Sequence, residues 1–257
     1  MTNGAPAQRS GRRFGRLLVV AGSDSGGGAG LQADLKTATS MGVYAMSAVT
    51  AVTAQDTHRV HQTLHVPPDL VALQMRTALE DIGADAIKTG MLCTKATIEA
   101  LLETVAGCAA GIPLIVDPVL TATSGETLLE PDAEAVLRER LVRQAYLVTP
   151  NAPEAARLTG CPVSNQDEML AAGRHMLAMG ARAVLITEAE VQEFAADRLD
   201  TPHTHGTGCT LASAIAAGIA DGRTLIDATS AGHAYVQRAL RTAPGLGGGR
   251  GPLNHLA

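Results

Sequence analysis

Short apolar segments alternate with helix-forming stretches through most of this sequence. The segments expected to form strands are 17–21, 43–54, 85–90, 113–116, 145–148 and 183–186. Apolar runs of this length are typical of strands buried on both faces, and a helix between two such runs supplies the crossover that parallel strands need. The pattern therefore predicts an α/β fold, with a mostly parallel central sheet covered by helices on both faces.

Helical periodicity and capping residues locate the helices between these strands. They are expected at 31–41, 67–82, 95–105, 132–142, 153–158, 166–179, 211–220 and 225–240. Residues 57–66 alternate between apolar and polar side chains, which favours a hairpin partner or an edge strand. The clustered glycines at 245–251 are, on the simplest interpretation, a flexible tail.

The composition argues against several classes of function. The 257-residue chain is 46% hydrophobic but only 2% aromatic, and its formal net charge is −5. Nucleic-acid surfaces use basic fields and exposed aromatic platforms, so no nucleic-acid partner is expected. No apolar run has the length that spans a membrane, and the four cysteines show neither CxxC pairs nor zinc-ligand spacing. We therefore expect a cytoplasmic protein that acts on a small molecule.

A glycine-rich segment, Gly206-Thr207-Gly208, runs directly into Cys209 and the apolar helix expected at 211–220. The first N–H groups of a helix lack partners, and glycine lets an anion approach them closely, so this segment fits a phosphate or a developing oxyanion. The same field favours the thiolate form of Cys209, which would then act as a base or nucleophile. These residues fit equally well a tightly packed Ala/Gly helix with a small buried cysteine.

Polar residues follow several of the predicted strands at their C-terminal ends. They are Asp24, Gln55, Thr89, Asp117 and Asn151. Ligands of open α/β sheets bind along this edge, so we expect these side chains to meet at one crevice. The loop at 22–30 adds a second strand–glycine–helix turn, although it lacks the Gly-Lys-Ser/Thr ending of a P-loop.

Several short motifs occur together and in the order found in one family. The motifs are 21–37 (AGSDSGGGAGLQADLKT), 49–57 (VTAVTAQDT), 88–92 (KTGML), 116–119 (VDPV), 149–155 (TPNAPEA), 203–216 (HTHGTGCTLASAIA) and 251–255 (GPLNH). In this arrangement the chain resembles the hydroxymethylpyrimidine/phosphomethylpyrimidine kinases of thiamine biosynthesis, which belong to the ribokinase-like superfamily. The resemblance implies a three-layer sandwich formed by a single kinase domain over 17–257. The residues before it, 1–16, are basic, and we expect them to form a disordered tail.

The resemblance also implies roles for residues of these motifs. Gly206, Thr207 and Gly208 match the anion hole of the family, and Cys209 matches its catalytic base. Four residues match the pocket that holds the pyrimidine: Ala29, Asp34, Gln55 and Met91.

The cofactors implied by the resemblance are ATP and Mg²⁺, with a monovalent cation as an option. Asp117 and Glu154 match acidic residues that position Mg²⁺, largely through water. Asn151, Thr207 and His205 match the nucleotide side of the family's site. The family further implies a homodimer.

Structural interpretations stay open for the same residues when the resemblance is set aside. Asp34 would then be a carboxylate on a helix surface, Gln55 a strand-end cap and Met91 a part of the core. Asp117 would start a turn, and Glu154 would compensate the dipole at a helix start.

The chain departs from the family pattern in two places. After residue 186 the family continues with Lys-Gly-Gly-His and a hairpin over the nucleotide, whereas here Thr187-Glu188-Ala189 follows and the segment 187–200 is short. This difference affects the ATP side of the site rather than the pyrimidine pocket. The second departure is Ser25-Gly26 in place of Pro-Ser, and we expect it to loosen the first glycine loop.

The leading hypothesis is ATP- and Mg²⁺-dependent phosphorylation of 4-amino-5-hydroxymethyl-2-methylpyrimidine, and then of its monophosphate to the diphosphate. A vitamin B6 (pyridoxine/pyridoxal) kinase is the first alternative, because those relatives share the fold and the cysteine of the anion hole. A non-catalytic pyrimidine-binding protein with an impaired nucleotide site is the second. The context of Gln55 and Met91 favours the aminopyrimidine.

Overall fold

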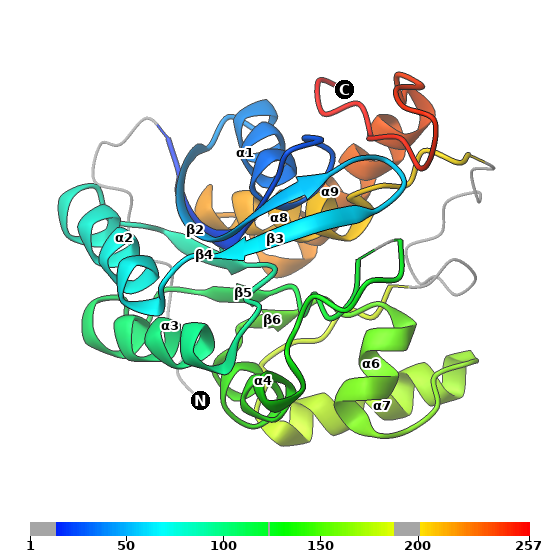
Figure 1. Ribbon diagram of the computed structural model, residues 1–257. Helices are drawn as coiled ribbons and strands as arrows, with labels where there is room; N and C mark the ends of the chain where they lie inside the picture. Colours follow the sequence, from blue (N-terminus) through cyan, green and yellow to red (C-terminus); the bar gives the residue numbers. More distant parts are fainter. Residues whose placement is uncertain (1–13, 123, 188–200) are drawn as a thin grey trace.

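A six-stranded sheet forms the centre of the computed structural model, which describes residues 14–122, 124–187 and 201–257 (Figure 1). The strands are β1 (Arg16–Asp24), β2 (Tyr44–Gln55), β3 (Val60–His65), β4 (Ala86–Thr89), β5 (Leu114–Val116) and β6 (Leu147–Val148). Their order across the sheet is β3-β2-β1-β4-β5-β6, and of these neighbouring pairs only β2–β3 is antiparallel. The mostly parallel sheet and the hairpin partner after β2 are therefore confirmed.

Helices cover both faces of this sheet, which confirms the predicted three-layer sandwich. Figure 1 shows α1 (Gly30–Ser40), α8 (Thr207–Ala220) and α9 (Leu225–Arg241) on one face, and α2 (Pro68–Asp81) and α3 (Lys95–Cys108) on the other. The layer of α2 and α3 continues into α4 (Pro131–Val136), the π-helical turn η1 (Leu137–Leu141), α5 (Val142–Gln144), α6 (Ala152–Thr159) and α7 (Gln166–Met179). The turn η1 interrupts the single helix expected at 132–142. Within the described ranges, no helix is both long and apolar enough to cross a membrane.

Strand β1 shows why the sheet needs two helical layers. Leu17 and Val19 pack into the core that α1 and α8 complete, whereas Leu18 and Val20 pack into the core on the side of α2 and α3. All four side chains are fully buried, and each such burial contributes about 1.5–3 kcal/mol to folding. Since both faces of the strand are apolar, polar groups are left to its C-terminal end.

The start of β1 lies within the tail that the sequence predicts at 1–16. Arg16 is the first residue of the strand, and its guanidinium forms an ion pair with Asp85 at 2.8 Å. Its backbone N–H donates to the same carboxylate at 3.0 Å. The remainder of the predicted tail, 1–13, lies outside the described residues.

The strand expected at 183–186 is not formed as a continuous strand. The segment lies beside β6 and meets it through an isolated parallel bridge between Val184 and Val148. Val148 N–H donates to the Ala183 carbonyl at 3.1 Å, and Leu185 N–H donates to the Val148 carbonyl at 2.9 Å. The ladder is interrupted because Pro150 has no N–H to donate, and the pairing resumes with an isolated bridge between Asn151 and Thr187.

The glycine-rich C-terminal segment is held against the body of the protein, so its interpretation as a flexible tail is wrong. Arg250 N–H donates to the Thr57 carbonyl at 2.9 Å, and His205 N–H donates to the Gly251 carbonyl at 3.2 Å. A Cβ atom at Gly249 would lie 2.4 Å from the same Thr57 oxygen, so the close approach needs glycine. The segment thereby joins the β2–β3 turn to the residues that precede α8.

His255 fixes the end of this segment over α8 and α9. Its Nε2 lies 3.2 Å from Thr210 Oγ1, and the Tyr235 hydroxyl donates to its carbonyl oxygen at 2.8 Å. Burial, with a smaller contribution from the positive charge of Lys36, lowers the pKa of the imidazole to about 4. His255 is therefore neutral in the folded protein at neutral pH.

We expect the free energy of unfolding to fall as the pH is lowered from 7 towards 4, in part through His255. Its pKa in the unfolded chain is about 6.5, so in this window the unfolded chain binds a proton that the folded chain does not. In urea unfolding, His255→Gln should flatten that part of the pH dependence, whereas His65→Gln, at the exposed end of β3, should not. Equal slopes for His255→Gln and the parent would contradict a neutral His255.

Candidate active site

The carboxyl ends of the strands and the start of α8 enclose a cavity of about 160 Å³. The predicted site residues on its wall are Ala29, Gln55, Met91, Asp117, Asn151, Glu154, His205, Gly206, Thr207, Gly208 and Cys209. The convergence on one crevice that the strand ends predict is therefore found. Two expected residues do not line the cavity, Asp34 and the strand-end residue Thr89.

The start of α8 is shaped by a close backbone contact. Gly206 is the N-cap residue with φ at +82°, and a Cβ atom there would lie 2.0 Å from the Gly28 carbonyl oxygen. Thr207 Oγ1 donates to the Thr204 carbonyl at 2.8 Å, which secures the turn. Gly208 has open space where its Cβ would be. The first N–H groups of α8 therefore face an approachable part of the cavity, as an anion site requires.

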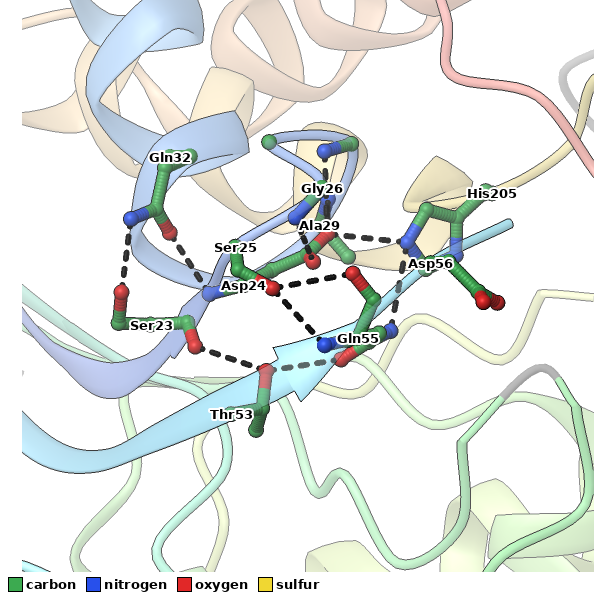
Figure 2. A network of polar contacts seen from close by, with 12 residues as sticks. Ser23, Asp24, Ser25, Gly26, Ala29, Gln32, Thr53, Gln55, Asp56 and His205 are labelled. Carbon is green, nitrogen blue, oxygen red and sulfur yellow. Dashed lines mark hydrogen bonds and ion pairs between the residues drawn. The ribbon is translucent and has the colours of Figure 1, made fainter. Parts of the chain in front are cut away.

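Asp24, at the end of β1, organises the first glycine loop (Figure 2). Its Oδ1 accepts from Gly26 N–H at 2.8 Å, and its Oδ2 accepts from Gly28 N–H at 3.0 Å and from Ala29 N–H at 2.8 Å. His205 Nε2 donates to Oδ2 at 3.0 Å. Burial opposes ionisation, but the hydrogen bonds from His205 and from the backbone lower the pKa of Asp24 below its ordinary value. The carboxylate therefore ties the loop to the residue that precedes the anion site.

Asp24 is a functional residue that the sequence identified only as one of the strand ends. The available signal was local, because an aspartate followed by glycines is suited to accept from the backbone N–H groups of its own turn. The contact with His205 carried no signal, since the two residues are 181 positions apart in the chain.

Gln55 reaches the cavity from the end of β2, and its neighbours restrict its side chain. Its Oε1 accepts from Thr53 Oγ1 at 3.2 Å, and its Nε2 lies 3.5 Å from His205 Nε2 (Figure 2). Its backbone N–H donates to Ser25 Oγ at 2.8 Å, and Ser25 Oγ donates to the Gln55 carbonyl at 3.0 Å. Ser25 thus ties the first glycine loop to β2, so the expectation that it loosens the loop is wrong.

Two acidic side chains, Asp117 after β5 and Glu154 in α6, also line the cavity. Glu154 forms a capping box with Asn151: Glu154 N–H donates to Asn151 Oδ1, and Asn151 N–H donates to Glu154 Oε2, both at 2.9 Å. Burial, together with the nearby Asp117 carboxylate, raises the pKa of Glu154 to about 8. Glu154 therefore lies at the start of a helix, as the structural interpretation expected, and it also lines the cavity.

This pair fits the way proteins hold Mg²⁺ in phosphate sites, where one or two carboxylates act together with substrate phosphates and water. Asp117 Oδ2 is buried without a hydrogen-bond partner. In the described part of the chain, no group of three or more His, Cys, Asp or Glu side chains forms a complete metal site. A cation here would therefore take its remaining oxygen ligands from the substrates.

Cys209 lies on the cavity wall in the first turn of α8, with its thiol close to Asp117. Burial raises the pKa of the thiol well above its ordinary value; Lys88 works in the opposite direction, and the Asp117 and Asp34 carboxylates reinforce the rise. The expectation that the helix field makes Cys209 a thiolate is wrong for the resting protein. Desolvation and two nearby negative charges outweigh the dipole.

Asp34 is the one predicted substrate ligand that the structure keeps away from the cavity. It is fully buried in α1, where Lys88 Nζ lies 3.0 Å from Oδ1 and 3.1 Å from Oδ2. Ser213 Oγ donates to Oδ1 at 2.6 Å. Because these partners occupy its carboxylate, neither the substrate contact nor the helix-surface interpretation describes Asp34.

Known proteins resemble this chain over most of its length. The family model described as phosphomethylpyrimidine kinase matches residues 24–254. The hydroxymethylpyrimidine/phosphomethylpyrimidine kinase of Streptomyces coelicolor is 43% identical over 253 residues, which cover 93% of this chain and 93% of that protein. The thiamine biosynthesis bifunctional protein ThiED of Geobacter sulfurreducens is 44% identical over 257 residues; they cover 94% of this chain but 52% of the relative, so the chain spans about half of its length.

A solved structure also resembles the fold of this chain. The pyridoxal kinase from Staphylococcus aureus in complex with ADP aligns with a TM-score of 0.85 and 32% sequence identity. The alignment covers 95% of this chain and 94% of that chain.

Replacement of Asp24 by asparagine should loosen the first glycine loop. The amide keeps the shape but presents an NH₂ group to N–H donors, and each unsatisfied buried donor costs about 1–3 kcal/mol. We expect Asp24→Asn to lower the free energy of urea unfolding by about that amount, whereas Asp56→Asn, at the exposed β2–β3 turn, should cost less. An Asp24→Asn protein as stable as the Asp56→Asn control would show that the carboxylate does not organise the loop.

Proposed function

Since this chain belongs to the phosphomethylpyrimidine kinase family, with its ribokinase-like sandwich, we propose that it phosphorylates 4-amino-5-hydroxymethyl-2-methylpyrimidine and then its monophosphate. The phosphate donor is ATP, and the product is the diphosphate used in thiamine biosynthesis. One observation carries the proposal: a glycine-lined helix start, a cysteine and two carboxylates meet at one cavity.

The start of α8 is the anion hole of this proposal. Phosphoryl transfer asks mainly for alignment and for stabilisation of charge on the equatorial oxygens. The Thr207 N–H donates to the Thr204 carbonyl at 3.3 Å, so the neighbouring N–H groups at the start of α8 would provide the fixed donors. The loss of one such donor costs about 3–4 kcal/mol in comparable oxyanion sites. The Gly28–Gly206 contact holds these donors in place before substrate arrives.

Asp117 and Glu154 would hold Mg²⁺ through their carboxylate oxygens and water. The cation supplies charge neutralisation for the ATP phosphates. Deprotonation of Glu154, whose pKa is raised to about 8, accompanies its use as a ligand. Asn151 caps α6, His205 is bound to Asp24, and Thr207 Oγ1 donates to the Thr204 carbonyl, so each of the three predicted nucleotide contacts also has a partner within the protein.

Cys209 Sγ would accept the proton of the hydroxymethyl group as a thiolate, after its own proton has passed to solvent. The Lys88 ammonium and the Gly30 N–H both favour that form against burial. A thiolate is a weaker base than an alkoxide, so it helps late, when the attacking hydroxyl has become acidic. The pyrimidine lies between Ala29, Gln55 and Met91 in this proposal, all on the cavity wall.

A vitamin B6 kinase is the second candidate. The close structural likeness to a pyridoxal kinase favours it, because the alignment covers nearly all of both chains. The identity to a named pyrimidine kinase is higher, at 43% against 32%, and this favours the aminopyrimidine. The non-catalytic alternative rested on the short segment 187–200, of which 188–200 lie outside the described residues.

Three further properties belong to the same proposal. Residues 17–257 act as one kinase domain in the cytoplasm, with a homodimer as the assembly. A monovalent cation assists the nucleotide site. Sedimentation equilibrium and assays with and without K⁺ measure the last two properties directly.

Transfer of phosphate from Mg²⁺-ATP to the hydroxymethylpyrimidine, with pyridoxal as a parallel acceptor, tests the function. We expect the pyrimidine monophosphate and then the diphosphate, identified by mass. Pyridoxal phosphate alone would assign the chain to the B6 kinases. Binding of the pyrimidine without transfer to either acceptor would favour the non-catalytic alternative.

Cys209→Ala should lower kcat by about 100-fold or more, the range typical of a lost general base. Its KM for the pyrimidine should stay within about threefold, because the anion hole and the pocket remain. The matched control is Cys161→Ala at an exposed position, which should leave both constants unchanged. A Cys209→Ala enzyme with near-normal kcat would remove the thiol from the mechanism.

A further inference from the structure

Lys88 is the largest of the fully buried side chains in the described residues, and it carries a charge. It lies in β4, between β1 and β5 in the sheet, and contributes nothing to the cavity wall. An ammonium group in such a place costs several kcal/mol unless it is paired. Its partners therefore explain why the chain keeps it.

The ammonium lies between two carboxylates with different surroundings. Its Nζ is 3.0 and 3.1 Å from the two oxygens of Asp34, and 3.4 Å from Oδ2 of Asp117. Lysine has three N–H donors, so two of them serve Asp34 and the third is left for Asp117. Apart from this ion pair, Asp117 Oδ2 is buried without a hydrogen-bond partner.

Asp34 has a second hydrogen-bond partner besides Lys88. Ser213, in α8, donates to its Oδ1 at 2.6 Å, and the carboxylate is fully buried. Ser213 thus adds a hydrogen bond to Asp34, while the ammonium itself is held by the Asp34 carboxylate. The chain of contacts thus runs from α8 through α1 and β4 to Asp117, whose carboxylate does line the cavity.

The pKa shifts of Lys88 and Asp117 agree with this chain of contacts. Burial lowers the pKa of Lys88, but the negative charge of Asp34, and that of Asp117 beyond it, raise the pKa above its ordinary value. Burial raises the pKa of Asp117, and Lys88 is the main influence that opposes the rise. One ammonium therefore serves two carboxylates, although Asp34 alone would satisfy a purely structural ion pair.

We propose that Lys88 is a positioning residue for phosphoryl transfer, which holds the Asp117 carboxylate in place beside Cys209 and is itself held by Asp34. The proposal rests on the proposed function, since it gives Asp117 a fixed orientation in that site. Asp34 then has a role in the reaction through Lys88 rather than through the substrate.

The first test removes the ion pair as a unit. Asp34→Asn/Lys88→Met leaves no unpaired charge at residues 34 and 88, so it separates the loss of positioning from the burial of a lone Asp34 carboxylate. Displacement of a catalytic group by about 1 Å can cost about 100-fold in rate. We expect kcat to fall by about that factor, with KM for the pyrimidine and for ATP within about threefold of the parent. A kcat within about fivefold of the parent would overturn the proposal.

Ser213→Ala is the matched control. It removes the other hydrogen bond to Asp34 but leaves Lys88 between both carboxylates. The urea midpoint should fall while kcat stays within about threefold of the parent. A control that loses kcat as strongly as Asp34→Asn/Lys88→Met would mean that any disturbance of this region stops the enzyme, and it would overturn a specific role for Lys88.

A stability cycle measures the Lys88–Asp117 contact without any substrate. In an Asp34→Asn background, urea midpoints are compared for Lys88→Met, for Asp117→Asn and for both changes together. We expect Lys88→Met to cost clearly less once Asp117 is neutral. If only the variant with both changes folds, that result also demonstrates the coupling. Additive effects would overturn the proposal.

The two proposals fail in different ways. A parent enzyme that transfers phosphate to neither acceptor overturns the proposed function, while the stability cycle still decides whether Lys88 holds Asp117. A parent that is active on pyridoxal alone changes the substrate, and the kinetic test of Lys88 then uses that acceptor. An active parent with additive stability effects overturns the Lys88 proposal and leaves the function intact.

Discussion

The close approach of two glycine backbones, Gly28 and Gly206, is the contact on which the geometry of the cavity depends. A Cβ atom at Gly206 would lie 2.0 Å from the Gly28 carbonyl oxygen, so no other residue fits without a shift of the backbone. Asp24 supports this contact, because its carboxylate accepts hydrogen bonds from backbone N–H groups of the first loop and from His205 Nε2. The same set of contacts therefore fixes both the first glycine loop, beside the proposed pyrimidine pocket, and the start of α8, the proposed anion hole.

Behind the Gly28–Gly206 contact, the arrangement of residues depends on buried charged groups more than on close backbone contacts. Lys88, Asp34 and Asp117 are all buried, and each would cost free energy if its partner were absent. The burial of apolar side chains in the surrounding sandwich offsets this free-energy cost. Functional sites commonly keep such groups at the expense of stability, since a fixed charge needs no rearrangement when the substrate binds. The raised pKa of Glu154 belongs to the same environment.

Residues of similar appearance in the sequence differ in how well they could be predicted. Asp117 and Gln55 follow strands, and parallel strands bring their ends to one edge, so their place in the cavity followed from local pattern. Asp34 lies on a helix, where the sequence indicates a periodicity but not which partner a buried carboxylate meets. The segment 183–186 has the composition of a strand, yet its ladder depends on the segment that it meets, where Pro150 has no N–H to donate.

The sequence by itself determined the layers, the parallel sheet and the two glycine-rich motifs. These features depend on short-range properties: side-chain periodicity, the absence of a Cβ atom, and the residue types that begin and end helices. Only the tertiary structure decided that Asp34 pairs with Lys88, that Asp24 binds His205, and that Cys209 rests as a thiol. These outcomes depend on through-space contacts and desolvation between residues 54 and 181 positions apart, which no local pattern encodes.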